Sequence, residues 1–290
     1  MQPRSIAKRS AQVAAVAIIA LLGGTGAGDP SAGDAGPSED LRAGKNFIPT
    51  QVRAEDDDRK VLDLYRGLRV SDVVDGMDKA GLQGIGIMSP DIRPVWKDTE
   101  RFSHRFAGIA VTARYVPTNR PPAGKTAPEE YDRWSGSWYG KLSPEPFVPL
   151  IRQGTALVIE DAPRADVGSI GSNNILSWRR SGCVGVVTSA TARDTDEVAA
   201  ERMPLYYREP GRGIRPGRNE IESVNRPVVC GGVLILPGDV VVADGDGVVV
   251  VPRAAAEEVA RYAREILDGD KAGRKKLYRD LGIPEDDSVR

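Results

Sequence analysis

Two short segments carry residue types that suit the binding of an oxyacid. The first is Gly168–Asn174 (GSIGSNN), which follows an apolar run and leads into a predicted helix. The free N–H groups at the start of a helix, together with the helix dipole, favour a bound anion. The residues whose amides would form this cradle are Gly171, Ser172, Asn173 and Asn174. An ordinary glycine-serine helix cap is the alternative interpretation of the same pattern.

The second segment is Thr191–Glu197 (TARDTDE), which follows a predicted strand at 184–188. The planar fork of Arg193 matches a carboxylate, and the oxygens of Asp194 suit a hard cation. Ligands of α/β sheets gather just beyond the carboxyl ends of strands. A solvated arginine beside an acidic helix start is the simpler alternative. Because two consecutive strand-to-helix junctions carry complementary groups, we predict that they form one site.

The histidine and cysteine content limits which metal this site could hold. The chain has one histidine, His104, and two cysteines, Cys183 and Cys230. Zinc sites usually draw on several such residues, so we expect Mg²⁺ or Mn²⁺ among oxygen ligands instead. His104 is not near a Gly-x-Ser-x-Gly motif, and we expect a surface or strand-end position for it. Both cysteines lie in apolar runs, which predicts buried residues and leaves a disulfide open.

The composition excludes several classes of function. The chain has 290 residues, 40% hydrophobic and 28% charged, with a formal net charge of -1. These values are ordinary for a globular protein, and no basic excess exists to bind a nucleic acid. We find no Rossmann or P-loop fingerprint, which argues against a nucleotide-dependent enzyme. The run Asp244–Gly247 (DGDG) lacks the remaining ligands of a calcium loop, so we predict a turn there.

The amino terminus has the order of a secretory signal. Basic residues precede an apolar run at 11–24, and small residues follow it. We predict a signal peptide at 1–28, a disordered linker at 29–50 and export of the remaining chain. The apolar run is short for a transmembrane helix, so no stable membrane insertion is expected after cleavage. An uncleaved membrane anchor is the alternative.

Hydrophobic periodicity places the two candidate segments in an α/β layer, within a domain at 51–290. Predicted helices lie at 56–68, 72–80 with Ser71 as N-cap, 173–181, 193–201 and 254–268. Predicted strands lie at 106–116, 155–160 and 184–188, with three short strands within 228–252. The polar, aromatic stretch at 117–141 shows no clear periodicity, so we predict an inserted loop there. Such a loop would serve as a lid, as an oligomer contact or as plain surface.

From about Val70 to Pro252 the chain resembles the RraA-like family. That family includes 4-hydroxy-4-methyl-2-oxoglutarate aldolases, oxaloacetate decarboxylases and the regulator of ribonuclease activity A. The matching pieces are 70–76 (VSDVVDG), the helix start at Gly171, 185–187 leading to Arg193 and Asp194, 231–232 with 237–239, and 243–248 ending at Pro252. A longer, exported subgroup is similar also at 117–121 (PTNRP) and 171–174 (GSNN).

The resemblance implies a layered, swivelling-type α/β domain with mixed sheets, assembled as a homotrimer or hexamer. It implies that amides at Gly171 to Asn174 hold a substrate carboxylate. It also implies that Arg193 contacts substrate and that Asp194 anchors the divalent metal, largely through waters. The chain departs from aldolase members at Ser172, where they carry an acid, and at Asn173 and Asn174, where they carry apolar residues.

The expected activity is that of a metal-dependent lyase acting on a small 2-keto acid. Retro-aldol cleavage or oxaloacetate decarboxylation would release pyruvate through its enolate, whose negative charge Arg193 and the cation would stabilise. The alternative is a non-catalytic binding protein on the same scaffold, recognising a small carboxylate or a protein partner. Metal-dependent turnover separates the two hypotheses.

Overall fold

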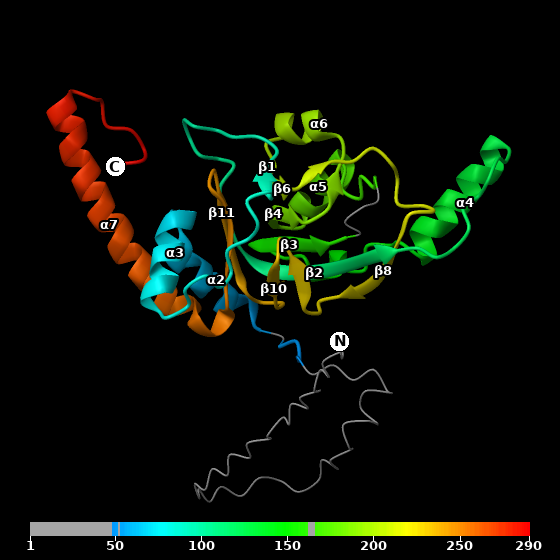
Figure 1. The fold of residues 1–290 in the computed structure, drawn as a ribbon, viewed down its shortest axis with the longest axis horizontal. Coiled ribbons are helices and arrows are strands. Elements are labelled where there is room, and N and C mark those ends of the chain that lie inside the picture. The colour runs from blue at the N-terminus through cyan, green and yellow to red at the C-terminus, as the bar shows by residue number, and fades with distance from the viewer. Residues whose placement is uncertain (1–47, 52, 162–165) are drawn as a thin grey trace, which may run out of the picture. The chain divides into compact units, whose positions relative to one another are not determined.

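A mixed sheet of eight strands forms the centre of the structure (Figure 1). The computed structural model describes residues 48–51, 53–161 and 166–290. The strands of this sheet are β1 (Arg93–Pro94), β2 (Phe106–Pro117), β3 (Thr155–Glu160), β4 (Cys183–Thr188), β6 (Leu205–Tyr207), β8 (Asn219–Val224), β11 (Val240–Asp244) and β12 (Gly247–Val251). They are ordered β1-β6-β4-β3-β2-β11-β12, and β8 pairs with β2 off this path. Strands β2, β3, β4 and β6 pair in parallel, and the other pairs are antiparallel. The predicted α/β fold with a mixed sheet is confirmed.

Strand β3 is buried on both faces, which explains its unbroken apolar sequence TALVIE. Leu157 and Ile159 pack on one face, in a cluster that includes Trp178 of α5 (Ser172–Arg180). Ala156 and Val158 pack on the opposite face, in a cluster that includes Cys230. Since both faces are covered, β3 is a rigid element along its length, from Thr155 to Glu160.

Three helices cover the β2, β11 and β12 part of the sheet. They are α2 (Glu55–Tyr65), α3 (Val70–Lys79) and α7 (Ala256–Leu281), and their apolar residues form one core cluster with these strands. The Tyr65 hydroxyl donates to the carbonyl of Ala256 at 2.8 Å, which ties α2 to α7. Helix α3 begins two residues earlier than predicted, at Val70 and not at 72. Its N-cap is Arg69, whose backbone N–H donates to the Asp72 carboxylate at 2.9 Å, so Ser71 is not the cap.

The carboxyl-terminal part contains more regular structure than the sequence pattern predicted. Four strands, not three, occupy 228–252, because β9 (Val228–Cys230) and β10 (Val233–Ile235) form a hairpin. Gly231 and Gly232 make its turn with φ of 57° and 81°, a conformation that glycine adopts freely. Helix α7 continues to Leu281, well beyond the predicted end at 268. Strands β6 and β8 were not predicted.

The inserted segment is not a loop throughout, because its second half is helix α4 (Pro128–Lys141). Tyr131, Trp134 and Trp138 lie at helical spacing, and their neighbouring ring centroids are 5.5 Å apart. This stripe was the signal for a helix, but Gly136 and Gly140 obscured it. The Trp138 indole donates to the carbonyl of Asn219 at 2.9 Å. Figure 1 shows α4 beyond the end of the sheet at which β8 lies.

The amino-terminal predictions fall almost wholly outside the described residues. These are the signal peptide at 1–28 and the linker at 29–50, of which only 48–50 are described. In the part of the chain that the structure describes, no helix is both long and apolar enough to cross a bilayer. Residues Ile48–Arg290 form one compact unit. Cys183 and Cys230 are buried and not bonded to each other, and burial raises the pKa of the Cys183 thiol to about 11.

Candidate functional site

The two predicted strand-to-helix junctions lie side by side. Helix α5 follows β3 and begins after Gly171, whereas α6 (Thr195–Ala200) follows β4 and begins after Asp194. The backbone N–H of Arg193 donates to the carbonyl of Ile170 at 2.8 Å, and Ile170 forms a parallel bridge with Ala192. The residues just before the two helices are therefore held together by main-chain hydrogen bonds.

A third segment extends this small ladder of backbone bonds. Strand β5 (Thr191–Ala192) pairs in parallel with β7 (Glu209–Pro210). The N–H of Gly168 donates to the carbonyl of Gly213 at 2.8 Å. Three loops that are far apart in sequence thus fix the backbone from which Arg193 and Asp194 project.

Two glycines of the first segment allow Arg193 and Asp194 to approach it closely. A Cβ atom on Gly171 would lie 2.6 Å from Oδ2 of Asp194. A Cβ atom on Gly168 would lie 2.6 Å from the Cβ of Arg193. Any side chain at either position would force these residues away, so the pattern Gly168-x-x-Gly171 serves contact between the two junctions.

Asp194 has a left-handed backbone, with φ of 55° and ψ of 39°. Such a conformation is uncommon for a non-glycine residue and is often found at functional sites. The side chain does not cap its own helix. Its Oδ2 accepts a hydrogen bond from the N–H of Ser172 at 3.2 Å, and its Oδ1 lies 3.8 Å from Nε of Arg193. The unusual backbone turns this carboxylate toward the start of the neighbouring helix α5.

The backbone amides of the predicted cradle have two different roles. The amide of Ser172 holds Asp194, so this amide does not serve a bound carboxylate as the sequence pattern suggested. The amides of Asn173 and Asn174 follow it in the first turn, where N–H groups have no acceptor within the helix. These two N–H groups point out of the amino-terminal end of α5 and suit an anion.

Beside these residues lies a cavity of about 330 Å³. It is lined by Tyr139, Ser143, Pro144, Glu145, Gly168, Ser169, Asn174, Arg193 and Arg215. Arg193 and Asn174 come from the two predicted segments, whereas Gly171, Ser172 and Asp194 adjoin the cavity through their contacts with each other and with Arg193. Tyr139 belongs to α4, so the insertion supplies part of the wall. The Arg193 side chain is 37% exposed and thus accessible to a ligand.

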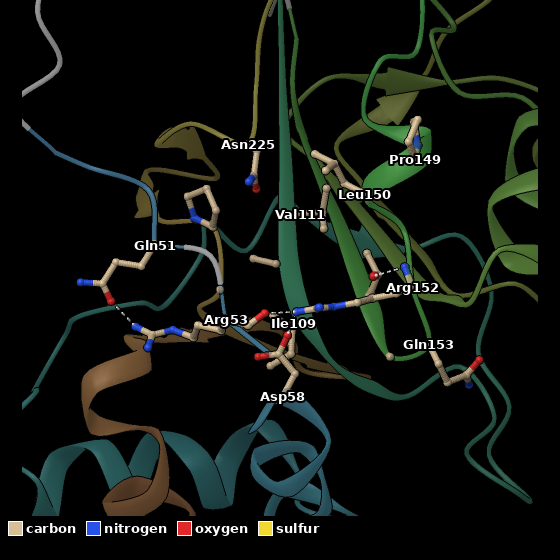
Figure 2. Close-up of a pocket in the computed structure, with 15 residues that line it drawn as sticks. Gln51, Arg53, Asp58, Ile109, Val111, Pro149, Leu150, Arg152, Gln153 and Asn225 are labelled. Carbon is tan, nitrogen blue, oxygen red and sulfur yellow. Dashed lines mark hydrogen bonds and ion pairs between the residues drawn. The ribbon is translucent and has the colours of Figure 1, made fainter. Parts of the chain in front are cut away.

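A second cavity, of about 260 Å³, lies at the amino end of β3 (Figure 2). Its lining includes Arg53, Ile109, Leu150 and Arg152. It shares no lining residue with the cavity at Arg193. The two cavities are therefore separate features at opposite ends of the same strand.

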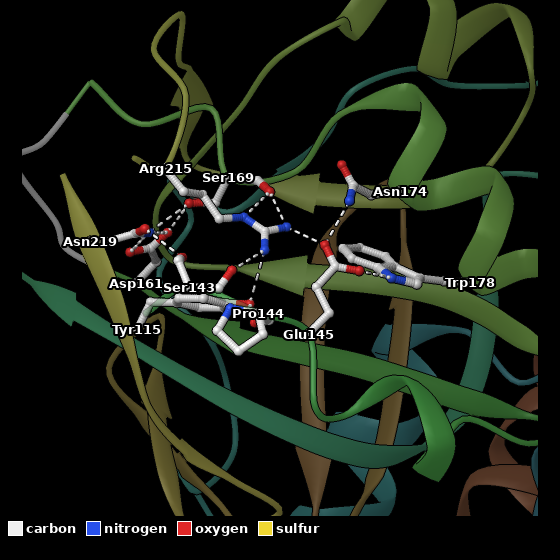
Figure 3. A network of polar contacts seen from close by, with 10 residues as sticks. All are labelled: Tyr115, Ser143, Pro144, Glu145, Asp161, Ser169, Asn174, Trp178, Arg215 and Asn219. Carbon is white, nitrogen blue, oxygen red and sulfur yellow. Dashed lines mark hydrogen bonds and ion pairs between the residues drawn. The ribbon is translucent and has the colours of Figure 1, made fainter. Parts of the chain in front are cut away.

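Arg215 is the centre of a buried polar network behind the first cavity (Figure 3). Its Nε and Nη2 both donate to the carbonyl of Ser169, at 3.1 and 2.9 Å. Its Nη1 donates to the carbonyl of Ser143 at 3.1 Å and to the Tyr115 hydroxyl at 3.2 Å. Its Nη2 also forms an ion pair with Glu145. All five guanidinium N–H groups are engaged, so Arg215 positions the walls and has no donor left for a ligand.

Glu145 joins the segment after the insertion to helix α5. Besides the ion pair with Arg215, its Oε1 accepts from the Asn174 side chain at 2.6 Å. Its Oε2 accepts from the Trp178 indole at 3.0 Å. The side chain of Asn174 is thus occupied within the protein, which leaves its backbone amide for a ligand.

The remainder of the network fixes the approach to Gly171. Asn219 donates from Nδ2 to both oxygens of Asp161 at 3.0 Å and to the Ser169 hydroxyl at 2.9 Å. The Ser143 hydroxyl donates to Oδ1 of Asn219 at 3.0 Å. Asp161 also accepts from the Ser169 hydroxyl. Since Ser169 is bonded from two sides, the turn before α5 has little freedom.

The sequence patterns did not reveal Arg215, Glu145 or Asn219 as parts of the site. A weak signal existed, because Arg215 lies in a Gly/Pro-rich segment, GIRPG at 213–217, and Glu145 lies between two prolines. Both settings are typical of irregular segments with a defined shape. Nothing in the local pattern indicates that these two segments meet, since they are 70 residues apart.

The donor set fits only certain metals. Within the described residues, no group of three or more His, Cys, Asp or Glu side chains is arranged to hold an ion. The Asp194 side chain is 38% exposed and keeps acceptor capacity beside the Ser172 contact. One carboxylate with waters and substrate oxygens suits a hard divalent ion such as Mg²⁺, which keeps much of its water shell, and does not suit zinc.

His104 takes no part in this site and is not on the surface. It is 3% exposed and precedes β2 by two residues, so the strand-end expectation is met and the surface expectation is wrong. Its Nδ1 accepts from the backbone N–H of Asp98 at 3.1 Å, and burial lowers its pKa. The histidine is a structural residue of the loop at 98–104.

Comparison with known proteins agrees with the fold and identifies the family. The family model described as "RraA-like: Aldolase/RraA" matches residues 70–250. The chain is 30% identical over 123 residues to a Halalkalibacterium halodurans protein named "Putative 4-hydroxy-4-methyl-2-oxoglutarate aldolase", which is 42% of this chain and 58% of that protein. The chain spans about half the length of the curated relatives that it matches first.

Solved structures with the same fold cover most of the chain. An uncharacterised protein of Pseudomonas syringae pv. tomato aligns with a TM-score of 0.59 and 25% identity, over 82% of this chain and 97% of that one. RraAS2 of Streptomyces coelicolor, described as an unusual member of the RNase ES inhibitor RraA protein family, aligns with a TM-score of 0.59 and 21% identity, over 78% of this chain and 99% of that one. Because the family model spans more than half of the sequence, this chain belongs to the RraA-like family.

Proposed function

We propose that the chain is a divalent-metal-dependent lyase that cleaves a carbon–carbon bond in a small 2-keto acid and releases pyruvate. The observation that carries this proposal is the contact between the two junctions, in which Asp194 accepts from the Ser172 amide beside Arg193. This contact gathers a cation ligand, a guanidinium and free helix amides at one cavity. Relatives at 26–30% identity that are named as aldolases support the same reaction class.

The protein's own groups have distinct roles in this proposal. The amides of Asn173 and Asn174 hold the substrate carboxylate, and the α5 dipole favours its charge. Arg193 donates to the carboxylate or to the 2-keto oxygen. Asp194 would hold Mg²⁺ or Mn²⁺, which when bound supplies positive charge to the keto oxygen as negative charge grows there.

The chemistry needs no covalent bond to the protein. In the retro-aldol direction the 4-hydroxyl group loses its proton, and the bond between C3 and C4 breaks. A carbonyl product leaves, and the enolate of pyruvate takes up a proton at C3. In oxaloacetate decarboxylation carbon dioxide is the leaving group and the same enolate results. Arg193 adds positive potential where that enolate forms, and loss of such a preorganised contact typically costs about 10²- to 10³-fold in rate.

A further carboxylate from a neighbouring copy is part of the proposal. Ser172 stands where aldolase members of the family carry an acid, and no group of three or more metal-ligating side chains gathers at Asp194 among the described residues. In a homotrimer or hexamer with sites at subunit boundaries, the adjoining subunit would supply it. If the copies supply none, the scaffold would bind small carboxylates without cleaving them, and this is the second candidate function.

The test is pyruvate release, measured by coupling to lactate dehydrogenase. The purified protein is given oxaloacetate or a 4-hydroxy-2-keto acid, with Mg²⁺ or Mn²⁺ and then with a chelator. We expect metal-dependent turnover that Asp194→Ala abolishes. Asp196→Ala is the matched control, because this exposed acid lies two residues away in α6 and should leave the rate unchanged.

Each alternative outcome has a definite meaning. Turnover that persists in the chelator, or that Asp194→Ala does not reduce, contradicts the mechanism. Absence of turnover together with metal-dependent binding of pyruvate would favour the binding protein over the lyase.

A further inference from the structure

The cavity at the amino end of β3 differs in chemistry from the proposed active site. It is formed by the segment before α2, by Ile109–Val111 of β2, by residues 149–155 leading into β3, and by the turn at Pro237 and Gly238. Its volume of about 260 Å³ is slightly below the range of drug-sized ligand pockets, so its ligand would be a small molecule. None of its lining residues takes part in the function proposed above.

One wall of this cavity is cationic. Arg152 reaches the buried Asp58 with its Nη2, which also donates to the carbonyl of Arg53 at 3.2 Å (Figure 2). Asp58 is shared, because its other oxygen accepts from Nη1 of Arg253 at 2.6 Å. One carboxylate therefore serves two guanidinium groups. Both side-chain hydrogen bonds that Arg152 makes to described residues leave from Nη2, and its side chain is 38% exposed.

Arg53 adds a third positive charge, and its guanidinium is incompletely paired. Its Nη2 donates to the neutral side chain of Gln51 at 2.8 Å. Its Nε is buried and has no hydrogen-bond partner among the described residues. A buried donor without a partner is costly, so a ligand that supplies an acceptor to this Nε would be favoured. Asp239 is a further acid nearby, but its oxygens already accept the backbone N–H groups of Leu236 and Arg253.

The opposite wall is apolar. Ile109, Val111, Pro149, Leu150 and Pro237 line it. Leu150 is 40% exposed although it is a large hydrophobic residue, and the side chains of the other four residues are hydrocarbon. Figure 2 shows the side chains of Val111 and Leu150 away from Arg53 and Gln51, whereas Ile109 lies beside Asp58. Apolar surface beside an unpaired cation suits an amphipathic anion.

We infer that this cavity is a second ligand site, which binds a small monocarboxylate with a short apolar tail. The carboxylate accepts from Nε of Arg53 and from Arg152, and the tail packs on Leu150 and the β2 side chains. A cation would be repelled by Arg53, which has no carboxylate partner among the described residues, and a dianion would place its second charge against the apolar wall. The site is separate from the Arg193 cavity and does not depend on the function proposed for it.

The experiment is calorimetric titration of the full-length protein with hexanoate as the probe. Acetate lacks the tail, 1-hexanol lacks the charge and hexylamine reverses it, so all three should bind at least about tenfold more weakly than hexanoate. Arg53→Gln removes one hydrogen bond to a charged group and should weaken hexanoate about tenfold or more. Arg133→Gln, on the exposed face of α4, is the matched control and should bind as the wild type does.

Two further variants keep the inference falsifiable if Arg53→Gln folds poorly. Leu150→Asp adds a negative charge at an exposed position of the rim and should abolish hexanoate binding. Arg193→Gln alters the other cavity and should leave the affinity for hexanoate unchanged. No saturable binding by the wild type, equal affinity in Arg53→Gln or Leu150→Asp, or loss of binding in Arg193→Gln would each overturn the proposal. Light scattering is run in parallel, because a cavity closed by a second copy of the chain would also bind no hexanoate and would count against it.

Discussion

Arg215 and Arg53 lie at opposite ends of β3 and differ in how many of their guanidinium N–H groups have a hydrogen-bond acceptor. Arg215 is 4% exposed, and all five of its N–H groups meet carbonyl, hydroxyl or carboxylate oxygens. Arg53 has a neutral glutamine as its hydrogen-bond partner and a buried Nε with none among the described residues. Burial and charge alone do not identify a binding residue. The number of N–H groups without an acceptor identifies such a residue, because a guanidinium whose donors are all engaged can only position the groups around it.

The same distinction holds within the proposed active site. Arg193 is partly exposed, and its ion-pair partner among the described residues is Asp194, at 3.8 Å, so its donors are available. Arg215 contacts the same cavity and is saturated. The site is thus built from an outer group of available donors at Arg193 and α5, and an inner network that positions them. Substitutions can test this division, from the largest expected effect to the smallest.

Loss of the saturated arginine should destabilise the fold most. Arg215→Met would leave Glu145 without its cationic partner and the carbonyl of Ser169 without its donors. Removal of one partner from a buried ion pair typically costs about 3–5 kcal/mol. Because Glu145 is 22% exposed, we expect the lower end of that range. Chemical denaturation measures the free energy of unfolding. Arg53→Met should change it by less than about 1 kcal/mol, and equal losses in both variants would contradict the comparison.

One methyl group added at Gly171 should disrupt the contact between the two strand-to-helix junctions. Gly171→Ala would place Cβ 2.6 Å from Oδ2 of Asp194 and would displace that carboxylate. We expect Mn²⁺-dependent binding of oxalate, measured by calorimetry, to weaken about tenfold or more while the fold persists. Gly136→Ala is the control, because its Cβ meets open space on α4 and should stabilise the protein by about 0.5–1 kcal/mol. Unchanged oxalate affinity in Gly171→Ala would contradict a role for Asp194.

The smallest expected effect is on the pH dependence of stability and comes from His104. Its Nε2 is buried without a partner in the described part of the chain. Burial is the main cause of its lowered pKa, with Arg105 and Lys97 adding to it and Asp244 and Asp98 opposing it. The unfolded chain therefore takes up the proton first. Stability should be constant above the ordinary value of 6.5 and should fall as the pH drops below it, toward the folded-state pKa.

His104→Asn keeps an acceptor at the position of Nδ1 for the Asp98 amide and removes this titration. Thermal unfolding of both proteins between pH 5 and pH 8 is the measurement. The variant should lose less stability than the wild type below pH 6.5. Parallel curves for the two proteins would show that His104 carries no pH dependence.

The sequence predicted those elements whose signal is local. Strand β3 has an unbroken apolar run, α5 begins directly after Gly171, and Arg193 and Asp194 follow a strand, so each could be placed from its own neighbours. The contact between the two junctions was expected from sheet topology, and the Asp194 bond to Ser172 agrees with it. The different role of the Ser172 amide was not visible, because it depends on the left-handed backbone of Asp194.

Features that depend on distant segments escaped prediction. Glu145 and Arg215 each lie in a short Pro-containing segment with no periodicity, and only the fold brings them together. Strand β8 is polar and half-exposed, since it pairs with β2 along one edge, so it lacks the alternation of a buried strand. Helix α4 was hidden by two glycines and by the lack of a wide apolar face, because it packs mainly through Trp138.

The central claim is that a cation held by Asp194 and an oxyacid held by Arg193 and the start of α5 meet at the cavity beside Arg193. A crystal structure after soaking with Mn²⁺ and oxalate, with anomalous data collected for manganese, tests it most directly. We predict manganese beside the Asp194 carboxylate, and oxalate within about 3 Å of the amides of Asn173 or Asn174 and of the Arg193 guanidinium. Manganese bound elsewhere, or oxalate bound without contact to Arg193 and α5, would contradict the account.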